Sequence, residues 1–151
     1  MNLTLEPEIV QWPTTHYVFI EKAGPFMQTA RQAWQELHQL EFLISAHNQI
    51  TGAMALYKMK PDTYRAGYIL AATPASLPCE LRYEQFAGGK YSKFVLTGSY
   101  SNLPQASGRV WEQVSKSNWM VRSDFAIENY ANDPKSTPED ELITEILIPT
   151  E

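Results

Sequence analysis

The chain has 151 residues, of which 44% are hydrophobic and 19% are charged, and this fits one globular domain that buries a core. It carries 12 Lys and Arg against 17 Asp and Glu, and the net charge of −5 without a Lys/Arg cluster argues against direct nucleic-acid binding and weakly favours cationic ligands. The single cysteine, a start without a signal-peptide pattern and the lack of an apolar run of about 18 residues predict a cytoplasmic protein that does not enter a membrane.

The first half of the chain predicts a strand, a helix and two further strands. β-forming residues before Gly24 and Pro25 indicate the first strand, which should end at this pair. Apolar residues spaced by three or four positions then indicate an amphipathic helix. The expected elements occupy residues 9–20, 26–44, 54–59 and 68–72.

The second half predicts the same series of elements. Gly88 and Gly89 should form a turn or bulge within the first strand segment. Ser101 or Asn102 is the expected N-cap of the helix, with Pro104 in its first turn. The expected elements occupy residues 81–97, 99–119, 125–131 and 142–148.

The two halves correspond position by position. The offset is 74 for Tyr17 and Tyr91, for Gly24 and Gly98, and for Phe26 and Tyr100; it is 77 for Trp34 and Trp111, and 73 for residues 57–61 and 130–134. An internal duplication is the simplest explanation, and coincidence is the alternative. We expect one domain over residues 1–151, with repeats at 9–72 and 81–149 related by a pseudo-two-fold axis. The seam between such repeats is a natural place for a cleft.

A family resemblance covers nearly the whole chain. It is carried by a C-terminal run with the sequence ENYANDP at residues 128–134, by residues 88–100, and by Trp111 and Trp119. Residues 137–142 and 144–149 continue the pattern. These stretches resemble GyrI-like domains, which are also the effector-binding domains of Rob-type and BmrR-type bacterial transcription regulators.

The resemblance implies an α+β fold of two βαββ repeats, SH2-like, with antiparallel sheets and a groove between the repeats. It also implies multidrug binding, in which lipophilic and often cationic molecules lie among aromatic rings and a pocket glutamate meets the positive charge. Glu128 occupies that position, whereas its match in the first repeat is Ala55. The regulators carry a helix-turn-helix before this domain, but the fold expected here begins at about residue 9, so we expect a stand-alone form.

Glu128 is therefore the main candidate for the site. Alternation along a strand alone favours an exposed glutamate on an edge strand, and the family pattern favours a pocket carboxylate instead. Aromatic residues are candidate walls of the pocket, although each of them could equally be core. The predicted ligand-binding residues are Glu128, Tyr130, Tyr91, Trp119, Trp111 and Tyr17.

The predicted function is a cytoplasmic binding protein for a lipophilic, cationic small molecule. One alternative is a hydrolase of reactive lipophilic compounds that uses the pocket glutamate. Another is an interaction protein, with a partner such as gyrase or a separate regulator. His16, His38 and His47 lack the spacing of metal ligands, and we expect neither a metal nor a cofactor.

Overall fold

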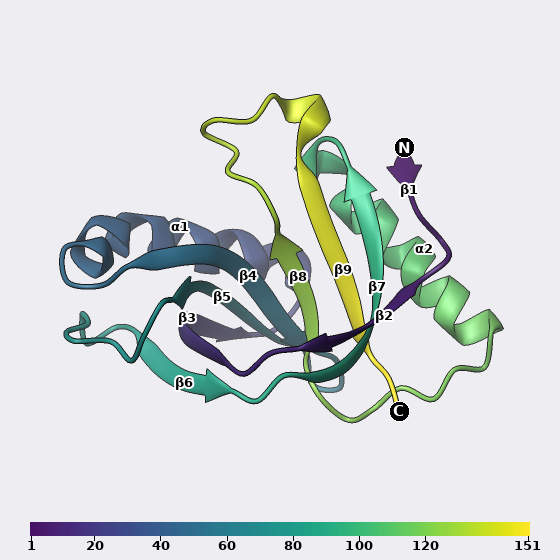
Figure 1. Ribbon diagram of the computed structural model, residues 1–151, viewed down its shortest axis with the longest axis horizontal. Helices are drawn as coiled ribbons and strands as arrows, with labels where there is room; N and C mark the ends of the chain where they lie inside the picture. The colour runs from purple at the N-terminus through teal and green to yellow at the C-terminus, as the bar shows by residue number, and fades with distance from the viewer. The chain divides into compact units, whose positions relative to one another are not determined.

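Two compact units, each with antiparallel strands and one α-helix, make up the protein in the computed structural model, which describes residues 1–151 (Figure 1). One unit holds residues 13–88, and the other holds residues 1–12 together with residues 89–151. The mixed α+β fold with antiparallel strands confirms the predicted fold class. Neither α-helix is long and apolar enough to cross a membrane.

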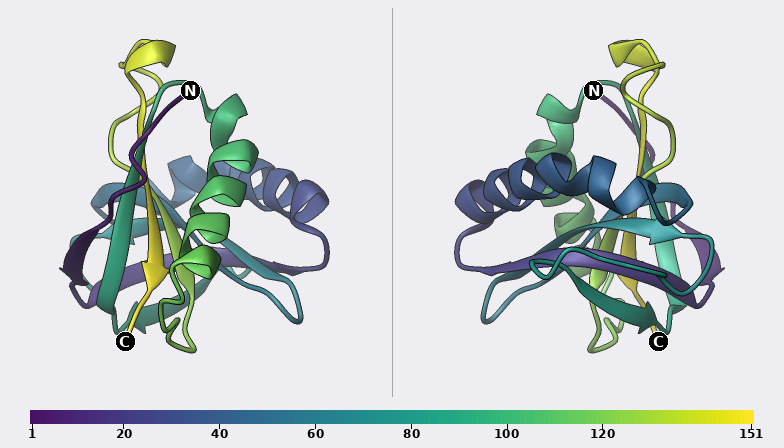
Figure 2. Two further views of the ribbon diagram at one scale, coloured as in Figure 1. Left: turned by 90° about the vertical axis from the view of Figure 1, so that its right-hand side faces the viewer. Right: turned by 90° about the vertical axis from the view of Figure 1, so that its left-hand side faces the viewer.

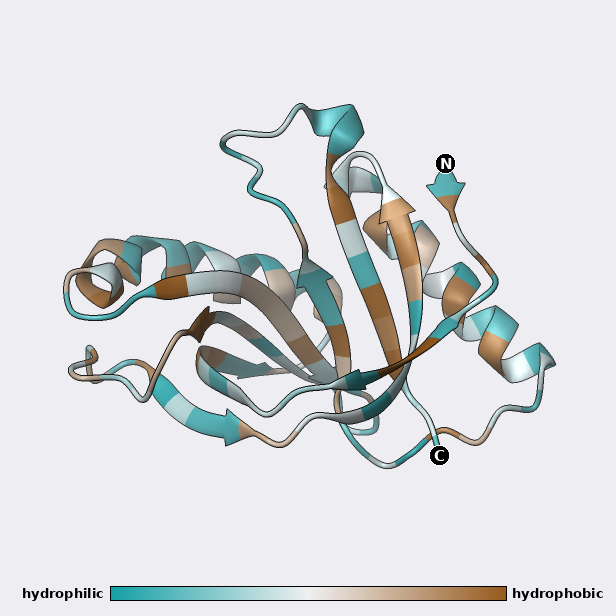
Figure 3. Cartoon of the chain, in the orientation of Figure 1, coloured by the Kyte–Doolittle hydropathy of each residue, from teal (hydrophilic) through white to brown (hydrophobic).

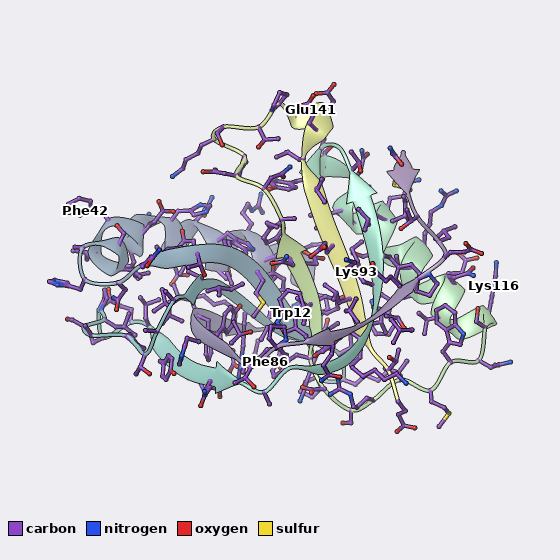
Figure 4. All side chains as sticks on the ribbon, viewed as in Figure 1. Trp12, Phe42, Phe86, Lys93, Lys116 and Glu141 are labelled. Carbon is purple, nitrogen blue, oxygen red and sulfur yellow. The ribbon has the colours of Figure 1, made fainter.

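The unit of residues 13–88 is a four-stranded sheet in the order β4-β5-β3-β6 with helix α1. Its elements are β3 (Thr15–Ala23), α1 (Phe26–Ser45), β4 (Ile50–Lys58), β5 (Thr63–Leu70) and β6 (Arg82–Phe86). The helix packs on β5 and β3, and it buries one stripe of residues, namely Thr29, Ala33, Leu37 and Ile44. Phe42 points away from this stripe and is 80% exposed (Figure 4).

The other unit has the strand order β8-β9-β7, with β1 and β2 both paired to the free side of β7. Its elements are β1 (Asn2–Leu3), β2 (Glu8–Trp12), β7 (Gly89–Thr97), η1 (Tyr100–Asn102), α2 (Leu103–Lys116), β8 (Ala126–Tyr130), η2 (Glu139–Glu141) and β9 (Ile143–Pro149). Helix α2 lies along one face of β7 and β9 (Figure 2). The core between them consists of Phe94, Leu96, Ala106, Val110, Val114, Ile146 and Ile148.

The helix predictions are confirmed with small shifts at the ends. Both hydrophobic and hydrophilic residues occur along α2 (Figure 3), and its buried residues Ala106, Val110 and Val114 are spaced by four positions, as an amphipathic helix requires. The turn η1 precedes α2, and the Ser99 hydroxyl accepts a hydrogen bond from the Ser101 N–H. Asn102 holds the N-cap position of α2 without a side-chain hydrogen bond, and Pro104 lies in the first turn. Proline is tolerated there because N–H groups of the first turn have no partner within the helix.

The prediction of one strand over residues 9–20 was wrong. The segment divides into β2 and β3, which pair with different strands, and Pro13 follows the end of β2. Proline has no N–H to donate to a strand ladder, so it favours such a break. Residues 81–97 likewise divide into β6 and β7, with Gly88 at a φ of 75° and Gly89 at 126°.

The two units share their topology. In each unit a β-α-β-β series gives the order second strand, third strand, first strand, and an additional antiparallel strand pairs with the first one. Gly24 and Gly98 both follow the first strand, with φ values of 124° and 122° that favour glycine. This agreement supports an internal duplication.

Strand register and helix burial agree as well. In the unit of residues 13–88, Tyr17 pairs with Ile69 and Ala55 pairs with Ala66. At the matching positions of the other unit, Tyr91 pairs with Pro149 and Glu128 pairs with Ile146. Both comparisons give the same residue-number offset between β5 and β9, so the strands correspond in register. The buried helix positions match at an offset of 77, namely Thr29 with Ala106, Ala33 with Val110, and Leu37 with Val114. The superposition of residues 9–72 on 81–149, and the groove between these repeats, stay predictions.

Candidate functional site

Glu128 stands on β8 and faces helix α2. Its register partner Ile146 belongs to the core beneath α2, and paired residues point to the same face of a sheet. Glu128 is half-buried, so it differs from the exposed edge-strand glutamate that alternation alone favours. The strand thus brings a carboxylate to the margin of an apolar core.

Two hydroxyl groups hold this carboxylate. The Tyr130 hydroxyl donates to Oε1 of Glu128 at 3.0 Å, and the Ser107 hydroxyl donates to Oε2 at 3.4 Å, which is long for a hydrogen bond. Tyr130 lies two positions along β8 and therefore on the same face. Ser107 comes from α2, next to the buried Ala106. A carboxylate accepts about four hydrogen bonds, so these two leave acceptor capacity for a ligand.

Burial raises the pKa of Glu128 above its ordinary value, because loss of water disfavours the charged form. The hydrogen bonds from Tyr130 and Ser107 act in the opposite direction, but desolvation prevails. A cation beside the carboxylate would restore the stabilisation that water no longer provides. The site is therefore suited to pairing with a positive charge or to proton transfer.

Tyr100 extends the site and was missed in the sequence analysis as a site residue. Its ring meets the Tyr130 ring edge to face, with 5.4 Å between the ring centroids. Its hydroxyl is buried and makes no hydrogen bond. Burial raises the pKa of Tyr100, and the negative charge of Asp133 adds to this effect. The signal in the sequence was the match between Tyr100 and Phe26, which differ by this one hydroxyl.

The two predicted tryptophans lie along and beyond α2. Trp111 follows Ser107 by four residues, so the two side chains are neighbours on the helix. Trp111 and Trp119 pack against the core of this unit. The ring centroids of Trp119 and Phe94 are 6.2 Å apart. Together with Val114, Met120 and neighbouring residues they line an open depression of about 520 Å³. The structure brings Trp111, but not Trp119, next to the residues that hold Glu128.

Tyr91 lies on the opposite face of its sheet from Glu128. On β7, Tyr91 points to the face opposite that of Phe94, which belongs to the core beneath α2. It shares its face with Lys93, which is labelled in Figure 4. Lys93 pairs with Glu8 at 3.2 Å. Tyr91 is fully buried and donates its hydroxyl to the Phe125 carbonyl at 2.8 Å. Burial raises the pKa of Tyr91. The structure therefore does not bring Tyr91 to Glu128.

Tyr17 belongs to the unit of residues 13–88. It is fully buried there, and its hydroxyl donates to the Met54 carbonyl at 2.8 Å. A Cβ added at Gly67 would meet the Tyr17 ring at 2.5 Å, so the ring packs directly on the backbone of β5. Its role in a ligand site stays a prediction. No group of three or more His, Cys, Asp or Glu side chains is placed to hold a metal ion.

A polar group held among aromatic and apolar side chains is typical of small-molecule-binding sites. The chain belongs to the GyrI-like family: the model of the GyrI-like small molecule binding domain matches residues 5–151. No curated protein matches the sequence.

Solved structures share the fold at low sequence identity. The C-terminal domain of EcmrR has a TM-score of 0.79 at 14% identity, with 100% of this chain and 99% of that chain covered. SAV2435 bound to tetraphenylphosphonium has a TM-score of 0.71 at 19% identity, covering 97% and 94%. A hydrolase from Listeria innocua has a TM-score of 0.59 at 11% identity, covering 98% and 93%.

Proposed function

We propose that the protein binds lipophilic cations beside Glu128, on the face of β8 that looks toward α2. The observation that carries this proposal is the half-buried carboxylate, whose pKa is raised by burial and which accepts hydrogen bonds from two neutral hydroxyls. A bulky cation with delocalised charge loses little hydration on entering such a site, and it relieves the desolvated carboxylate.

The aromatic neighbours suit the same ligand class. The faces and edges of Tyr130, Tyr100 and Trp111 offer apolar contact, and a ring face attracts a cation by about 0.5–2 kcal/mol. The structural relative SAV2435 was solved with tetraphenylphosphonium, which is an ion of this class. The proposed location is the cytoplasm, where a separate regulator or another protein would read the bound state.

Two ions of equal shape and opposite charge test the proposal. The purified protein is titrated calorimetrically with tetraphenylphosphonium and with tetraphenylborate. We expect the cation to bind and the anion to bind at least tenfold more weakly. Glu128→Gln keeps the shape of the side chain and removes its charge, so it should weaken cation binding by about ten- to a hundredfold. Equal affinity for both ions would refute a charge-reading role for Glu128.

Hydrolysis is the second candidate function. A carboxyl group whose pKa is raised by burial is suited to general acid–base chemistry, and a structural relative is a hydrolase. Under this alternative, Glu128→Gln abolishes turnover of a reactive lipophilic compound while its affinity changes little. Monitoring both the bound ligand and its breakdown products by mass spectrometry separates hydrolysis from binding alone.

A further inference from the structure

Glu128 and two of the hydroxyl-bearing residues near it occur in only one of the two corresponding units. At the offsets established from the strands and helices, Glu128 matches Ala55, Ser107 matches Ala30, and Tyr100 matches Phe26. Tyr130 has a tyrosine as its match, which is Tyr57. The unit without the acid therefore also lacks the hydroxyls that correspond to Ser107 and Tyr100.

The Phe26 ring shows that the Tyr100 hydroxyl is not needed for packing. Phe26 and Tyr57 meet at a centroid distance of 5.5 Å and an interplanar angle of 70°. Tyr100 and Tyr130 meet at 5.4 Å and 68°. The ring geometry is the same with and without the hydroxyl, so the oxygen of Tyr100 is not needed to hold the two rings in this arrangement.

The Tyr100 hydroxyl is also unfavourable for stability as it stands. It is buried and has no hydrogen-bond partner, although buried polar groups are almost always paired. The ring that carries it packs against Tyr130, whose own hydroxyl bonds Glu128 at 3.0 Å. An unpaired hydroxyl one ring away from the candidate carboxylate points to a partner that arrives with the ligand.

We propose that Tyr100 is a specificity-determining residue whose hydroxyl donates a hydrogen bond to a neutral oxygen of the ligand, close to the cationic centre. The preferred ligand class is then a lipophilic cation that bears an ether, carbonyl or hydroxyl oxygen near its charge. This inference rests on the proposed function of Glu128. Tyr100 is half-buried and stands on the three-residue turn η1. Because its hydroxyl is buried, the proposal requires this turn to shift as the ligand binds.

Two cations that differ by one atom test the inference. (2-Methoxyethyl)triphenylphosphonium and n-butyltriphenylphosphonium have the same length and charge, and only the first carries an oxygen. We expect the wild-type protein to bind the methoxyethyl cation about three- to tenfold more tightly than the butyl cation, which corresponds to one hydrogen bond. Tyr100→Phe should abolish this difference by weakening the methoxyethyl cation alone.

Tyr130→Phe is the matched control, because it removes a hydroxyl that acts through Glu128. It should change the affinity for both cations by the same factor and preserve their ratio. Tyr100→Phe should also leave the melting temperature of the free protein unchanged or raise it, since the lost hydroxyl had no partner.

The outcomes separate the two proposals. If both cations bind and Tyr100→Phe weakens them equally or not at all, the role of Tyr100 fails and that of Glu128 stands. A wild-type protein that binds the two cations equally, or a Tyr100→Phe variant that melts several degrees lower, also overturns the role of Tyr100. If neither cation binds to the wild-type protein, the proposed function fails and this inference fails with it.

Discussion

The Tyr130 hydroxyl lies 3.0 Å from Oε1 of Glu128, two positions away on strand β8. This hydrogen bond stabilises the charged carboxylate, whereas burial of the same group favours the protonated form. The protonation state of Glu128 therefore depends on a neighbouring side chain that can be altered without touching the acid.

Tyr130→Phe should move the pH dependence of cation binding to higher pH. Without the hydroxyl, the pKa of Glu128 rises further, so the carboxylate becomes protonated, and loses the cation, at a higher pH than in the wild-type protein. Titrations with tetraphenylphosphonium from pH 4 to 8 locate the midpoint for each protein. Tyr57→Phe is the control, because the residue that matches Glu128 in that unit is Ala55. An unchanged midpoint in Tyr130→Phe contradicts the role assigned to this hydrogen bond.

Tyr91→Phe should lower stability and leave the affinity for tetraphenylphosphonium unchanged. The variant loses a buried hydrogen bond and leaves the Phe125 carbonyl without this donor, which costs about 1–2 kcal/mol. Tyr91 lies on the opposite face of the sheet from Glu128, so the ligand should not depend on its hydroxyl. Urea denaturation measures the free energy of unfolding, and calorimetry measures the affinity. A tenfold loss of affinity would place Tyr91 in the ligand site after all.

Arg65→Met should destabilise the unit of residues 13–88. The Arg65 side chain is 8% exposed, and it contacts Glu21 at 2.8 Å and Glu84 at 2.6 Å. Its guanidinium also lies over the Phe19 ring, 4.3 Å from the centroid. Because both glutamates are partly exposed, we expect a loss of about 1–3 kcal/mol rather than the full effect of a buried pair. Arg82→Met, at a side chain that is 57% exposed, should cost less than about 1 kcal/mol.

The pH dependence of this destabilisation has a definite sign. Burial alone would raise the pKa of Glu21, but the hydrogen bond and charge of Arg65 outweigh it, and the pKa is lowered. Stability from the pair is thus present above the unfolded-state pKa of about 4.3 and is lost as the pH falls through the lower folded-state value. The difference between Arg65→Met and the wild-type protein, measured by urea denaturation, should be full at pH 7 and should shrink below about pH 4. A difference that persists at pH 3 would assign it to lost packing on Phe19.

Much of the fold was predictable because helices and strands leave periodic patterns in the chain. Apolar residues spaced by three or four positions indicated α1, and the matched tyrosines and glycines indicated two similar units. The break at Pro13 was not predictable in the same way. The segments on both sides favour β structure, and only their pairing with different strands separates them.

The site was predictable only in part. The family pattern pointed to Glu128 and Tyr130, which the structure brings together. Ser107 gave no signal, because a serine within a helix is usually a solvent-facing residue, and its contact with Glu128 depends on how α2 packs. For Tyr91, alternation along the strand indicated which residues share its face. It did not indicate that Glu128 lies on the opposite face of the sheet.

Glu128→Gln should stabilise the free protein at neutral pH while it weakens cation binding. The folded-state pKa of Glu128 is raised, so its contribution to stability is fully present below the unfolded-state value of about 4.3 and is lost as the pH rises through the folded-state value. Above that value the wild-type protein must keep a desolvated charge, and the glutamine variant does not. We therefore expect the variant to melt higher than the wild-type protein at pH 8 and the gap to close as the pH falls toward 4. Thermal denaturation of both proteins at pH 4, 6 and 8 without ligand measures the gap. With saturating tetraphenylphosphonium at pH 8 the order should reverse, because the cation binds the protein that retains the carboxylate more tightly and therefore stabilises it more than the variant. A variant that melts lower than the wild-type protein at every pH without ligand would show that the carboxylate stabilises the fold. That result would contradict the proposal that Glu128 is kept in the site to bind a cation.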